Sequence, residues 1–342
     1  MRIGLLTGGG DCQGLNAAIQ AIVTRAAQYG FEVFGIEDGY EGLITGRIRP
    51  LKREDVDGIY QVGGTILGTS RKNPVKSEED IKSVLENVRK FGLDALIVIG
   101  GDDTLGAAAK LYERGIPIVG VPKTIDNDLH VTDYSIGFWT AVDVIAEALD
   151  RLHTTARSHK RIVIAEIMGR YAGWLALIGG LAGGAHIILI PEKPLDLDEI
   201  CRIIKKREEE GKLYTLIAVA EGVKLPETGE VAVAAAEKDE YGHVRLGGIG
   251  KLLEQELKKR LGREVRSTIL GYIQRGGSPT AFDRVLGTRL GLKAVDLVKE
   301  KKFGYAVILR GREIVSVKLS EVAVGEPRKV PKEFFDYLTI FA

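Results

Sequence analysis

The sequence predicts an α/β protein with parallel sheets that carry helices on both faces. Short apolar runs of strand length alternate with segments of helical periodicity, an order that builds parallel sheets. Glycine-rich and polar motifs stand at the ends of the apolar runs, where such sheets bind ligands. The predicted strands are residues 3–6, 32–36, 95–99, 116–121, 162–167, 186–190 and 216–220, and the predicted helices are residues 16–29, 78–91, 104–114, 140–154, 171–179 and 197–210.

The composition is that of a folded protein without a bulk charge. The 342 residues are 45% hydrophobic and 28% charged, and 48 Lys and Arg against 47 Asp and Glu give a net charge of +1. This balance argues against a protein that holds nucleic acid or a membrane surface by bulk charge. Glycine accounts for 43 residues, well above its usual share of about 7%. The glycines cluster at the ends of apolar runs, which indicates sharp turns or close approach of the backbone to a ligand.

Cysteine usage and the apolar stretches bear on location. Cys12 and Cys201 cannot make a disulfide framework, and neither has a Cys-x-x-Cys partner for zinc. The chain begins with a short apolar run and no basic leader, so we expect no signal peptide. Residues 174–190 contain glycines and His186, so we expect a helix, a turn and a buried strand there and no membrane span. A reducing cytoplasm is the expected location.

A glycine-rich loop, Thr7-Gly8-Gly9-Gly10-Asp11-Cys12-Gln13-Gly14, joins the first predicted strand to the first predicted helix. Backbone N–H groups and the helix dipole at such a junction favour an anion. The dinucleotide fingerprint fails because Gln13 stands at its third glycine, and the chain has no Gly-x-x-x-x-Gly-Lys-Ser/Thr run. A structural turn and a nicotinamide enzyme both stay open, the latter because Glu37 and Asp38 end the second strand, where a ribose-binding carboxylate could lie.

Two further strand ends carry carboxylates. One is Gly100-Gly101-Asp102-Asp103-Thr104, where adjacent carboxylates suit a magnesium–phosphate site, although a single Asp there is usually a helix cap. The other is Pro122-Lys123-Thr124-Ile125-Asp126-Asn127-Asp128, which combines carboxylates, a cation and a hydroxyl group. These are the groups that phosphoryl transfer needs for positioning and charge stabilisation, and the alternative is an exposed loop.

Arginines form a further group of candidate phosphate ligands, because guanidinium groups bind phosphate through paired hydrogen bonds. Each one alone could be a solvated surface residue, but two of them are flanked by glycine at element ends, in Met168-Gly169-Arg170 and in Tyr272-Ile273-Gln274-Arg275-Gly276. The five candidates are Arg71, Arg161, Arg170, Arg266 and Arg275. His153 and His159 have no paired Ser or Cys nucleophile, so we expect a surface or interface role for them.

Read in order, the glycine loop, the Gly-Gly-Asp loop and residues 124–128, 168–170 and 272–275 resemble the 6-phosphofructokinases, from residue 2 to about 298. The resemblance implies two doubly wound, Rossmann-like α/β domains with the active site in the cleft between them. It also implies phosphoryl transfer to the 1-hydroxyl of fructose 6-phosphate, giving fructose 1,6-bisphosphate. The expected parts are a donor domain of 1–137 with about 275–304, a sugar-phosphate domain of 138–274 with about 305–320, an excursion or flap at 223–250, and an extension at 321–342.

The resemblance implies a role for each motif residue. Asp126 matches the base that deprotonates the sugar hydroxyl, and Asp102 matches the aspartate linked to Mg²⁺. The expected catalytic set is Asp126, Lys123, Asp103, Thr124 and Arg170, and the expected donor ligands are Gly9, Gly10, Arg71, Asp103 and Lys123. The sugar phosphate is expected at Thr124, Ile125, Asp126, Met168, Gly169, Arg170, Glu221, Tyr272 and Arg275, with Arg161 and Arg266 supplied by a neighbouring subunit. Tyr272 departs from the pattern, because many ATP-dependent members have histidine there.

The donor is inferred from Asp103 and Lys123. ATP-dependent relatives typically have glycine at both places, which leaves room for the α-phosphate, whereas the pair found here is that of the pyrophosphate-dependent branch. A carboxylate at Asp103 would repel an α-phosphate, and Lys123 would neutralise pyrophosphate. Lysine also occurs in ATP-using relatives, so Asp103 carries most of the discrimination. If Asp103 is only a helix cap and Lys123 a solvent-facing charge, ATP could still bind.

The resemblance therefore predicts a reversible, Mg²⁺-dependent enzyme that acts on fructose 6-phosphate and pyrophosphate. It further implies a homo-oligomer, a dimer or a tetramer, with sites shared between subunits. Allosteric control is expected to be absent, because the effector positions of the bacterial ATP-dependent enzymes are occupied here by Gln20, Thr24, His153 and His186, which do not preserve the charges. The alternatives are an ATP-dependent kinase of the same fold, a nicotinamide-linked oxidoreductase and a non-catalytic sugar-phosphate sensor.

Overall fold

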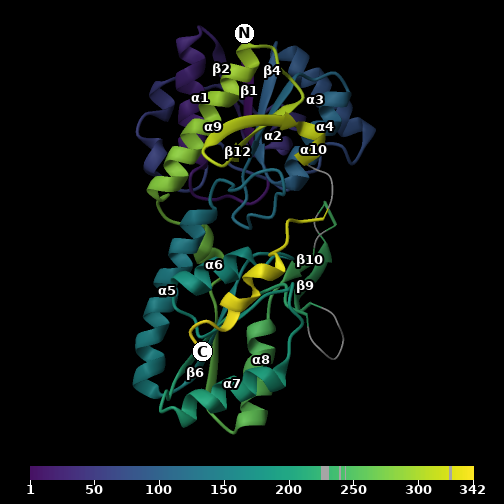
Figure 1. Ribbon diagram of the computed structural model, residues 1–342. Coiled ribbons are helices and arrows are strands. Elements are labelled where there is room, and N and C mark those ends of the chain that lie inside the picture. Colours follow the sequence, from purple (N-terminus) through teal and green to yellow (C-terminus); the bar gives the residue numbers. More distant parts are fainter. Residues whose placement is uncertain (225–230, 239, 243, 323–325) are drawn as a thin grey trace. The chain divides into compact units, whose positions relative to one another are not determined.

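The computed structural model describes residues 1–224, 231–238, 240–242, 244–322 and 326–342. The chain divides into two compact units (Figure 1). Unit 1 consists of Met1–Thr140, Asp239–His243 and Arg275–Glu326, and unit 2 of Ala141–Lys238, Val244–Gln274 and Pro327–Ala342. Parts of the expected excursion at 223–250 and of the expected extension at 321–342, namely residues 225–230, 239, 243 and 323–325, lie outside the described residues.

Unit 1 is built on a mostly parallel sheet. Its described strands are β1 (Arg2–Thr7), β2 (Glu32–Ile36), β3 (Ile48–Pro50), β4 (Ala95–Gly100), β5 (Ile118–Pro122), β12 (Tyr305–Arg310) and β13 (Glu313–Lys318), in the order β13-β12-β5-β4-β1-β2-β3. The edge strands β3 and β13 are antiparallel to their neighbours. The chain winds from β1 to β2 on one side and later to β4 and β5 on the other. Ligands bind at the carboxyl ends of strands beside such a reversal.

The helices of unit 1 include one very close pair. The described helices are α1 (Leu15–Gln28), α2 (Tyr40–Thr45), α3 (Glu78–Lys90), α4 (Asp102–Glu113), α9 (Ala281–Lys299) and α10 (Leu319–Val322), with the 3-10 turns η1 (Glu54–Val56) and η2 (Ile59–Gln61). α9 packs along α1 at backbone distance, because a Cβ at Gly287 would lie 2.7 Å from the Gly14 carbonyl oxygen and one at Gly291 2.7 Å from that of Ala18. The two glycines thereby hold α9 against the helix that follows the glycine loop.

Unit 2 has a smaller, fully parallel sheet. Its described strands are β6 (Ile162–Ile167), β7 (Ile187–Leu189), β8 (Thr215–Ala220) and β11 (Val265–Ile269), in the order β11-β6-β8-β7, beside the antiparallel pair β9 (Val233–Lys238) and β10 (Val244–Leu246). Its helices are α5 (Phe138–His159), which begins in unit 1, α6 (Trp174–Ala182), α7 (Leu197–Glu209) and α8 (Ile249–Leu261), with the turns η3 (Gly271–Arg275) and η4 (Lys332–Thr339).

The predicted α/β fold with parallel sheets is confirmed in both units. Each predicted strand and helix has a counterpart, and the apolar stretch 174–190 forms α6, a turn and β7. Among the described residues, no helix combines the length and the apolar character that crossing a membrane requires.

The structure corrects the prediction for residues 305–320, which were expected in the sugar-phosphate domain. They form β12, β13 and the start of α10 in unit 1, and β12 pairs in parallel with β5 through Tyr305–Val119 and Ala306–Gly120. Gly120 also leaves room for α10, because a Cβ there would lie 2.7 Å from the Leu319 side chain. The sheet of unit 1 is thus completed by chain that follows α9.

The C-terminal segment, expected as an extension without a role, packs on unit 2 from Pro327 onward. Trp174 Nε1 donates a hydrogen bond to the Arg328 carbonyl at 2.9 Å, and Arg207 Nη1 donates one to the Phe341 carbonyl at 2.9 Å. The side chain of Leu338 is buried. These contacts attach the segment to unit 2.

The close contact between α1 and α9 gives a stability prediction. Replacing Gly291 with Ala should lower the stability of unit 1 by about 1–3 kcal/mol, because the new methyl group overlaps the Ala18 carbonyl. Helix propensity alone would favour Ala by about 1 kcal/mol, so the sign separates the two effects. Thermal unfolding measures it, with Val285→Ala on the exposed side of α9 as control. An unfolding midpoint of Gly291→Ala at or above that of the parent would contradict the packing argument.

Candidate active site

The carboxyl ends of β1, β4 and β5 meet at one edge of the sheet of unit 1. Thr7 lies opposite Ile99 and Gly100 opposite Pro122. The loops that follow are joined by backbone hydrogen bonds, from Gly8 N to Ile99 O and from Lys123 N to Gly100 O, both at 2.9 Å. The structure therefore brings together the glycine loop, the Gly-Gly-Asp loop and the loop 123–128, which sequence analysis predicted one by one.

The glycine loop is closely surrounded. A Cβ at Gly8 would lie 2.7 Å from the Thr104 side chain, and a Cβ at Gly10 would lie 2.7 Å from Arg275 Nη1. The Gly9 N–H donates to the Ser70 carbonyl at 3.1 Å, while Thr69 Oγ1 donates to the Gly9 carbonyl at 2.5 Å. The Gly9 amide predicted as a donor ligand is thus paired within the protein.

Lys123 is buried, with 3% of its surface exposed, so it is not the solvent-facing charge considered as an alternative. Its Nζ donates to the Gly8 carbonyl at 2.9 Å and also to the Gly10 carbonyl. The pKa of Lys123 is lowered to about 8, mainly by burial; Cys12, Asp11 and Asp126 oppose this shift, and Arg275 adds to it. Keeping a buried lysine charged costs free energy, and a bound anion would offset this cost. Lys123 is therefore suited to bind an anion.

Asp126, the predicted base, is 5% exposed, and its Oδ1 is buried with no hydrogen-bond partner among the described residues. Its backbone N–H donates to Thr124 Oγ1 at 3.1 Å, and the Thr124 carbonyl accepts from Ser135 Oγ at 2.6 Å. The side chain of Ile125 is fully buried, so contact with a substrate there would have to come from the backbone. The loop holds one carboxylate oxygen ready to accept a proton.

Asp102 and Asp103 occupy the first turn of α4. The N-cap residue is Gly101, so neither aspartate occupies the N-cap position that was the alternative explanation. Carboxylates in the first turn are stabilised by the helix dipole. Thr104, the next residue, is buried and close to Gly8 and Gly9, so the two aspartates adjoin the glycine loop.

The arginines predicted for phosphate are distributed over several places. Arg275 belongs to unit 1 and donates through Nη1 to the Asp11 carbonyl at 3.0 Å, which puts it against the glycine loop. Arg71 follows Ser70, whose carbonyl holds the Gly9 N–H. Within residues 68–71 the sequence predicted a role for the arginine alone; Thr69 and Ser70 were missed, because their only signal is their place beside Gly68.

In unit 2, Met168, Gly169 and Arg170 form a tight turn after β6. The Glu221 carboxylate accepts from Gly169 N at 3.3 Å and from Arg170 N at 3.0 Å. Arg170 has a φ of 49°, a left-handed conformation that is unusual for a residue with a side chain. The turn is therefore held by the predicted Glu221 in a shape that the sequence alone does not favour.

Gln274 belongs to the motif 272–275, but the sequence predicted no role for it. It is fully buried, and its Oε1 accepts from Met168 N at 3.2 Å, so it supports the same turn. Tyr272, two residues earlier in η3, is 66% exposed. The motif 272–275 thus has a buried supporting residue beside an exposed predicted ligand.

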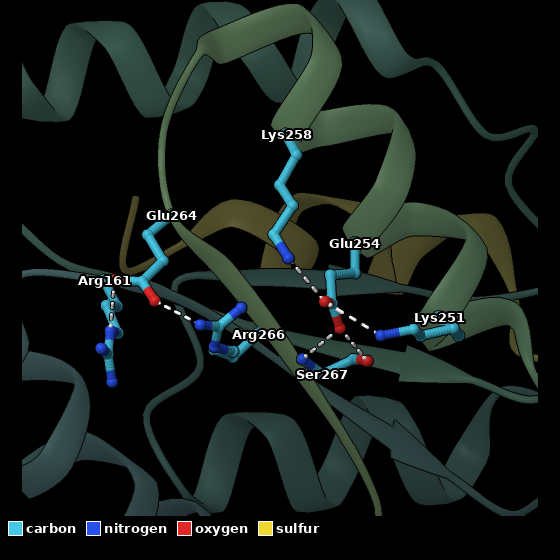
Figure 2. Close-up of polar contacts among 7 residues, drawn as sticks. All are labelled: Arg161, Lys251, Glu254, Lys258, Glu264, Arg266 and Ser267. Carbon is cyan, nitrogen blue, oxygen red and sulfur yellow. Dashed lines mark hydrogen bonds and ion pairs between the residues drawn. The ribbon is translucent and has the colours of Figure 1, made fainter.

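Arg161 and Arg266 are not brought to this turn. Arg161 precedes β6, whereas Met168 follows it, and a strand of six residues spans about 20 Å. Arg266, near the start of β11, lies opposite Val163 of β6. Figure 2 shows both arginines at this end of the sheet beside Glu264. Within one chain, the two arginines and Arg170 belong to opposite ends of the same strands.

The three loops of unit 1 supply a buried cation, a buried carboxylate and further carboxylates at a helix N-terminus, which are the parts of a phosphoryl-transfer site. The phosphofructokinase family model matches residues 2–298, and the chain belongs to this family, as its motifs predict.

Similar proteins and a solved structure support membership of this family. The chain is 51% identical over 341 residues to a pyrophosphate–fructose 6-phosphate 1-phosphotransferase of Dictyoglomus thermophilum, covering 100% of this chain and 98% of that one. It is 50% identical over 335 residues to an ATP-dependent 6-phosphofructokinase of Corynebacterium efficiens, covering 97% and 96%. The phosphofructokinase of Pichia pastoris in the T-state aligns with a TM-score of 0.82 at 32% identity, over 94% of this chain and 35% of that one.

The state of Lys123 gives a pH prediction. The charge of sulfate is constant between about pH 6 and 10, so its affinity should fall about tenfold per pH unit above pH 8, as Lys123 loses its proton. The nearby Cys12 thiol has a pKa raised by burial to about 12, so it stays neutral over this range. Calorimetric titration measures the affinity, and Lys123→Met should bind weakly at every pH. A pH-independent affinity in the parent protein would rule out Lys123 as the anion ligand.

Proposed function

We propose that this chain is a pyrophosphate-dependent phosphofructokinase, which transfers a phosphoryl group reversibly from pyrophosphate to the 1-hydroxyl of fructose 6-phosphate. Relatives named for pyrophosphate and for ATP are 51% and 50% identical to it, so overall similarity supports the reaction more strongly than the donor. The observation that carries the donor is the pair of Asp103, in the first turn of α4, and the buried Lys123.

Charge explains the preference for the smaller donor. An α-phosphate next to Asp103 would bring like charges together, and this repulsion costs roughly several kcal/mol unless a cation offsets it. Lys123 offsets the charge of a donor phosphate, but its ammonium group is already shared between the Gly8 and Gly10 carbonyls. Pyrophosphate needs compensation for only two phosphoryl groups, which Lys123, Arg71 and the N-terminus of α4 would supply.

The proposed reaction uses Asp126 as general base. Its carboxylate accepts the proton of the 1-hydroxyl while that oxygen attacks a phosphorus atom of pyrophosphate. The new O–P bond forms as the bridging P–O bond breaks, and inorganic phosphate leaves with the bridging oxygen. Lys123 and Thr124 of unit 1, together with Arg170 of unit 2, offset the charge on the transferring group. Met168, Gly169, Glu221, Tyr272 and Arg275 are proposed to hold the sugar phosphate.

Asp102 is proposed to hold Mg²⁺ together with the donor phosphates. The described residues contain no group of three or more His, Cys, Asp or Glu side chains able to hold a metal ion. This fits Mg²⁺, which usually binds to one or two carboxylates and to substrate phosphates, keeping several waters. When bound, the ion neutralises charge on the phosphates.

We propose that each site draws on two copies of the chain, in a dimer or a tetramer. Arg161 and Arg266 lie at the opposite end of β6 and β11 from Arg170, so the pair of arginines would come from a neighbouring subunit. Cys12 and Cys201 are both free, which supports a reducing cytoplasm as the location.

We also propose that the enzyme lacks allosteric control. The surroundings of His186 weaken one part of the argument for this. Burial lowers the pKa of His186 to about 3, so this residue is neutral at physiological pH. It nevertheless lines a pocket of about 500 Å³ together with Arg157, Lys160, Arg207 and Lys212. The argument for lost effector binding therefore rests mainly on Gln20 and Thr24 of unit 1.

Replacing Asp126 with Asn keeps the size of the side chain and removes the base. We expect kcat to fall by about 10²–10⁴-fold, because proton transfer in the transition state is lost, while the KM for both substrates changes little. The assay is formation of fructose 1,6-bisphosphate, with thermal unfolding to show that the variant stays folded. A kcat within tenfold of the parent would remove Asp126 from the role of base.

The donor assignment is tested with Asp103→Gly. The parent should use pyrophosphate well and ATP poorly, and the variant should shift the ratio of the two kcat/KM values toward ATP by about a hundredfold, since a few kcal/mol of repulsion disappears. Asp57→Gly, at an exposed aspartate, is the matched control. If the parent protein itself prefers ATP, the family and the sugar site stand, but our interpretation of Asp103 fails.

A further inference from the structure

Glu264 lies between two arginines at the start of β11 (Figure 2). Its Oε2 accepts a hydrogen bond from Arg161 Nε at 2.8 Å, and its Oε1 accepts one from Arg266 Nη2. Strand register brings the three together, because β11 runs parallel to β6 with Val265 opposite Ile162. Each oxygen of this carboxylate therefore holds one arginine.

The two arginines remain accessible to a ligand. Their side chains are 30% and 52% exposed, and each guanidinium carries further N–H donors besides the one that Glu264 accepts. The hydrogen bond from Arg161 lowers the pKa of Glu264, so the carboxylate is ionised at neutral pH. Two cations and one anion leave a net positive charge, which suits a phosphate group.

The backbone that carries Arg266 is held firmly from the other side. Glu254 of α8 accepts from Ser267 N at 3.0 Å and from Ser267 Oγ at 2.6 Å, while Lys251 and Lys258 donate to its other oxygen at 3.1 and 2.8 Å (Figure 2). Burial raises the pKa of Glu254, but hydrogen bonds from Lys258, Ser267 and Lys251 outweigh this effect and lower the pKa to about 2. The strand under Arg266 is thus locked to α8, so only the arginine side chain needs a further constraint.

We propose that Glu264 is a positioning residue, which holds Arg161 and Arg266 in the orientation that receives the phosphate of the sugar substrate. The inference rests on the proposed function, in which these arginines bind the 6-phosphate. Both side chains are long and flexible, and two like charges side by side repel each other. A carboxylate that binds both offsets the repulsion and fixes them before the ligand arrives, which reduces the entropy lost on binding.

A purely structural ion pair would behave differently. Ion pairs at this level of exposure contribute little to folding stability, so a structural role predicts only a small change in the unfolding midpoint and no selective effect on one substrate. A positioning role instead predicts weaker binding of the ligand that carries the phosphate. The difference is visible in which KM changes.

The test uses Glu264→Ala and Glu264→Gln in the full-length protein. We expect the KM for fructose 6-phosphate to rise by about tenfold in Glu264→Ala, the order expected for two side chains that must be ordered on binding, and less in Glu264→Gln, whose amide oxygen still accepts one bond. The KM for pyrophosphate and kcat should stay within about twofold, since this interaction is made equally in the ground and transition states. Glu264→Asp, which keeps the charge, should recover part of the affinity.

The matched control is Glu78→Gln, which breaks the exposed ion pair of Glu78 with Arg114 at 2.7 Å in unit 1 and should leave both KM values unchanged. An unchanged KM for fructose 6-phosphate, a lower one, or an equal rise for pyrophosphate would overturn the proposal. Failure of the proposed function shows separately, as a parent protein without turnover. Calorimetric binding of fructose 6-phosphate to the parent and to Glu264→Ala then still decides the role of Glu264.

Discussion

The ammonium group of Lys123 is buried among the carbonyl oxygens of the glycine loop, and the geometry of the surrounding loops depends on this contact. A buried cation is costly unless polar groups surround it, so the loop has to curve around Nζ. The left-handed backbone at Gly9, with a φ of 78°, provides that curvature. The loops at this edge of the sheet therefore pack around the ammonium group or against a loop that contacts it. An incoming anion would offset the remaining positive charge of Lys123.

Carboxylates hold the backbone at three other places, and two of them, Glu166 and Asp283, are buried. Glu221 binds two amides of the turn at 169–170, Glu166 binds Gly248 N and Gly250 N at the start of α8, and Asp283 binds Gly137 N and Thr140 N at the start of α5. A charge-assisted bond to an amide is stronger than a neutral one, which helps to offset desolvation of the carboxylate. Function and fold share this device, because the turn that Glu221 orients also carries Arg170.

Much of the fold follows from local pattern, whereas contacts between distant segments do not. The alternation of apolar runs and helical segments predicts β1, β2 and β4 to β8 with the helices α1 and α3 to α7, and strand ends predict which loops meet. The sequence pattern does not reveal that residues 305–318 return to β5, since that pairing joins segments far apart in the chain and leaves no local signal. Likewise, a lysine in a polar loop looks exposed, and only the loops folding over Lys123 make it buried. A buried residue such as Gln274, which supports a turn through a hydrogen bond, cannot be recognised from the periodicity of the sequence.

Donor choice illustrates why overall similarity and local chemistry answer different questions. Nearly equal identity to relatives named for two donors means that overall similarity does not distinguish the donors. Discrimination has to come from groups that meet only the part of ATP that pyrophosphate lacks. Under the proposed function, Asp103 in the first turn of α4 would be such a group, because the buried Lys123 that could offset its charge is already committed to the glycine loop. A single residue can then determine the donor although hundreds of residues are shared. If it weakens the binding of one donor by a few kcal/mol, the ratio of the two affinities changes by roughly two or more orders of magnitude.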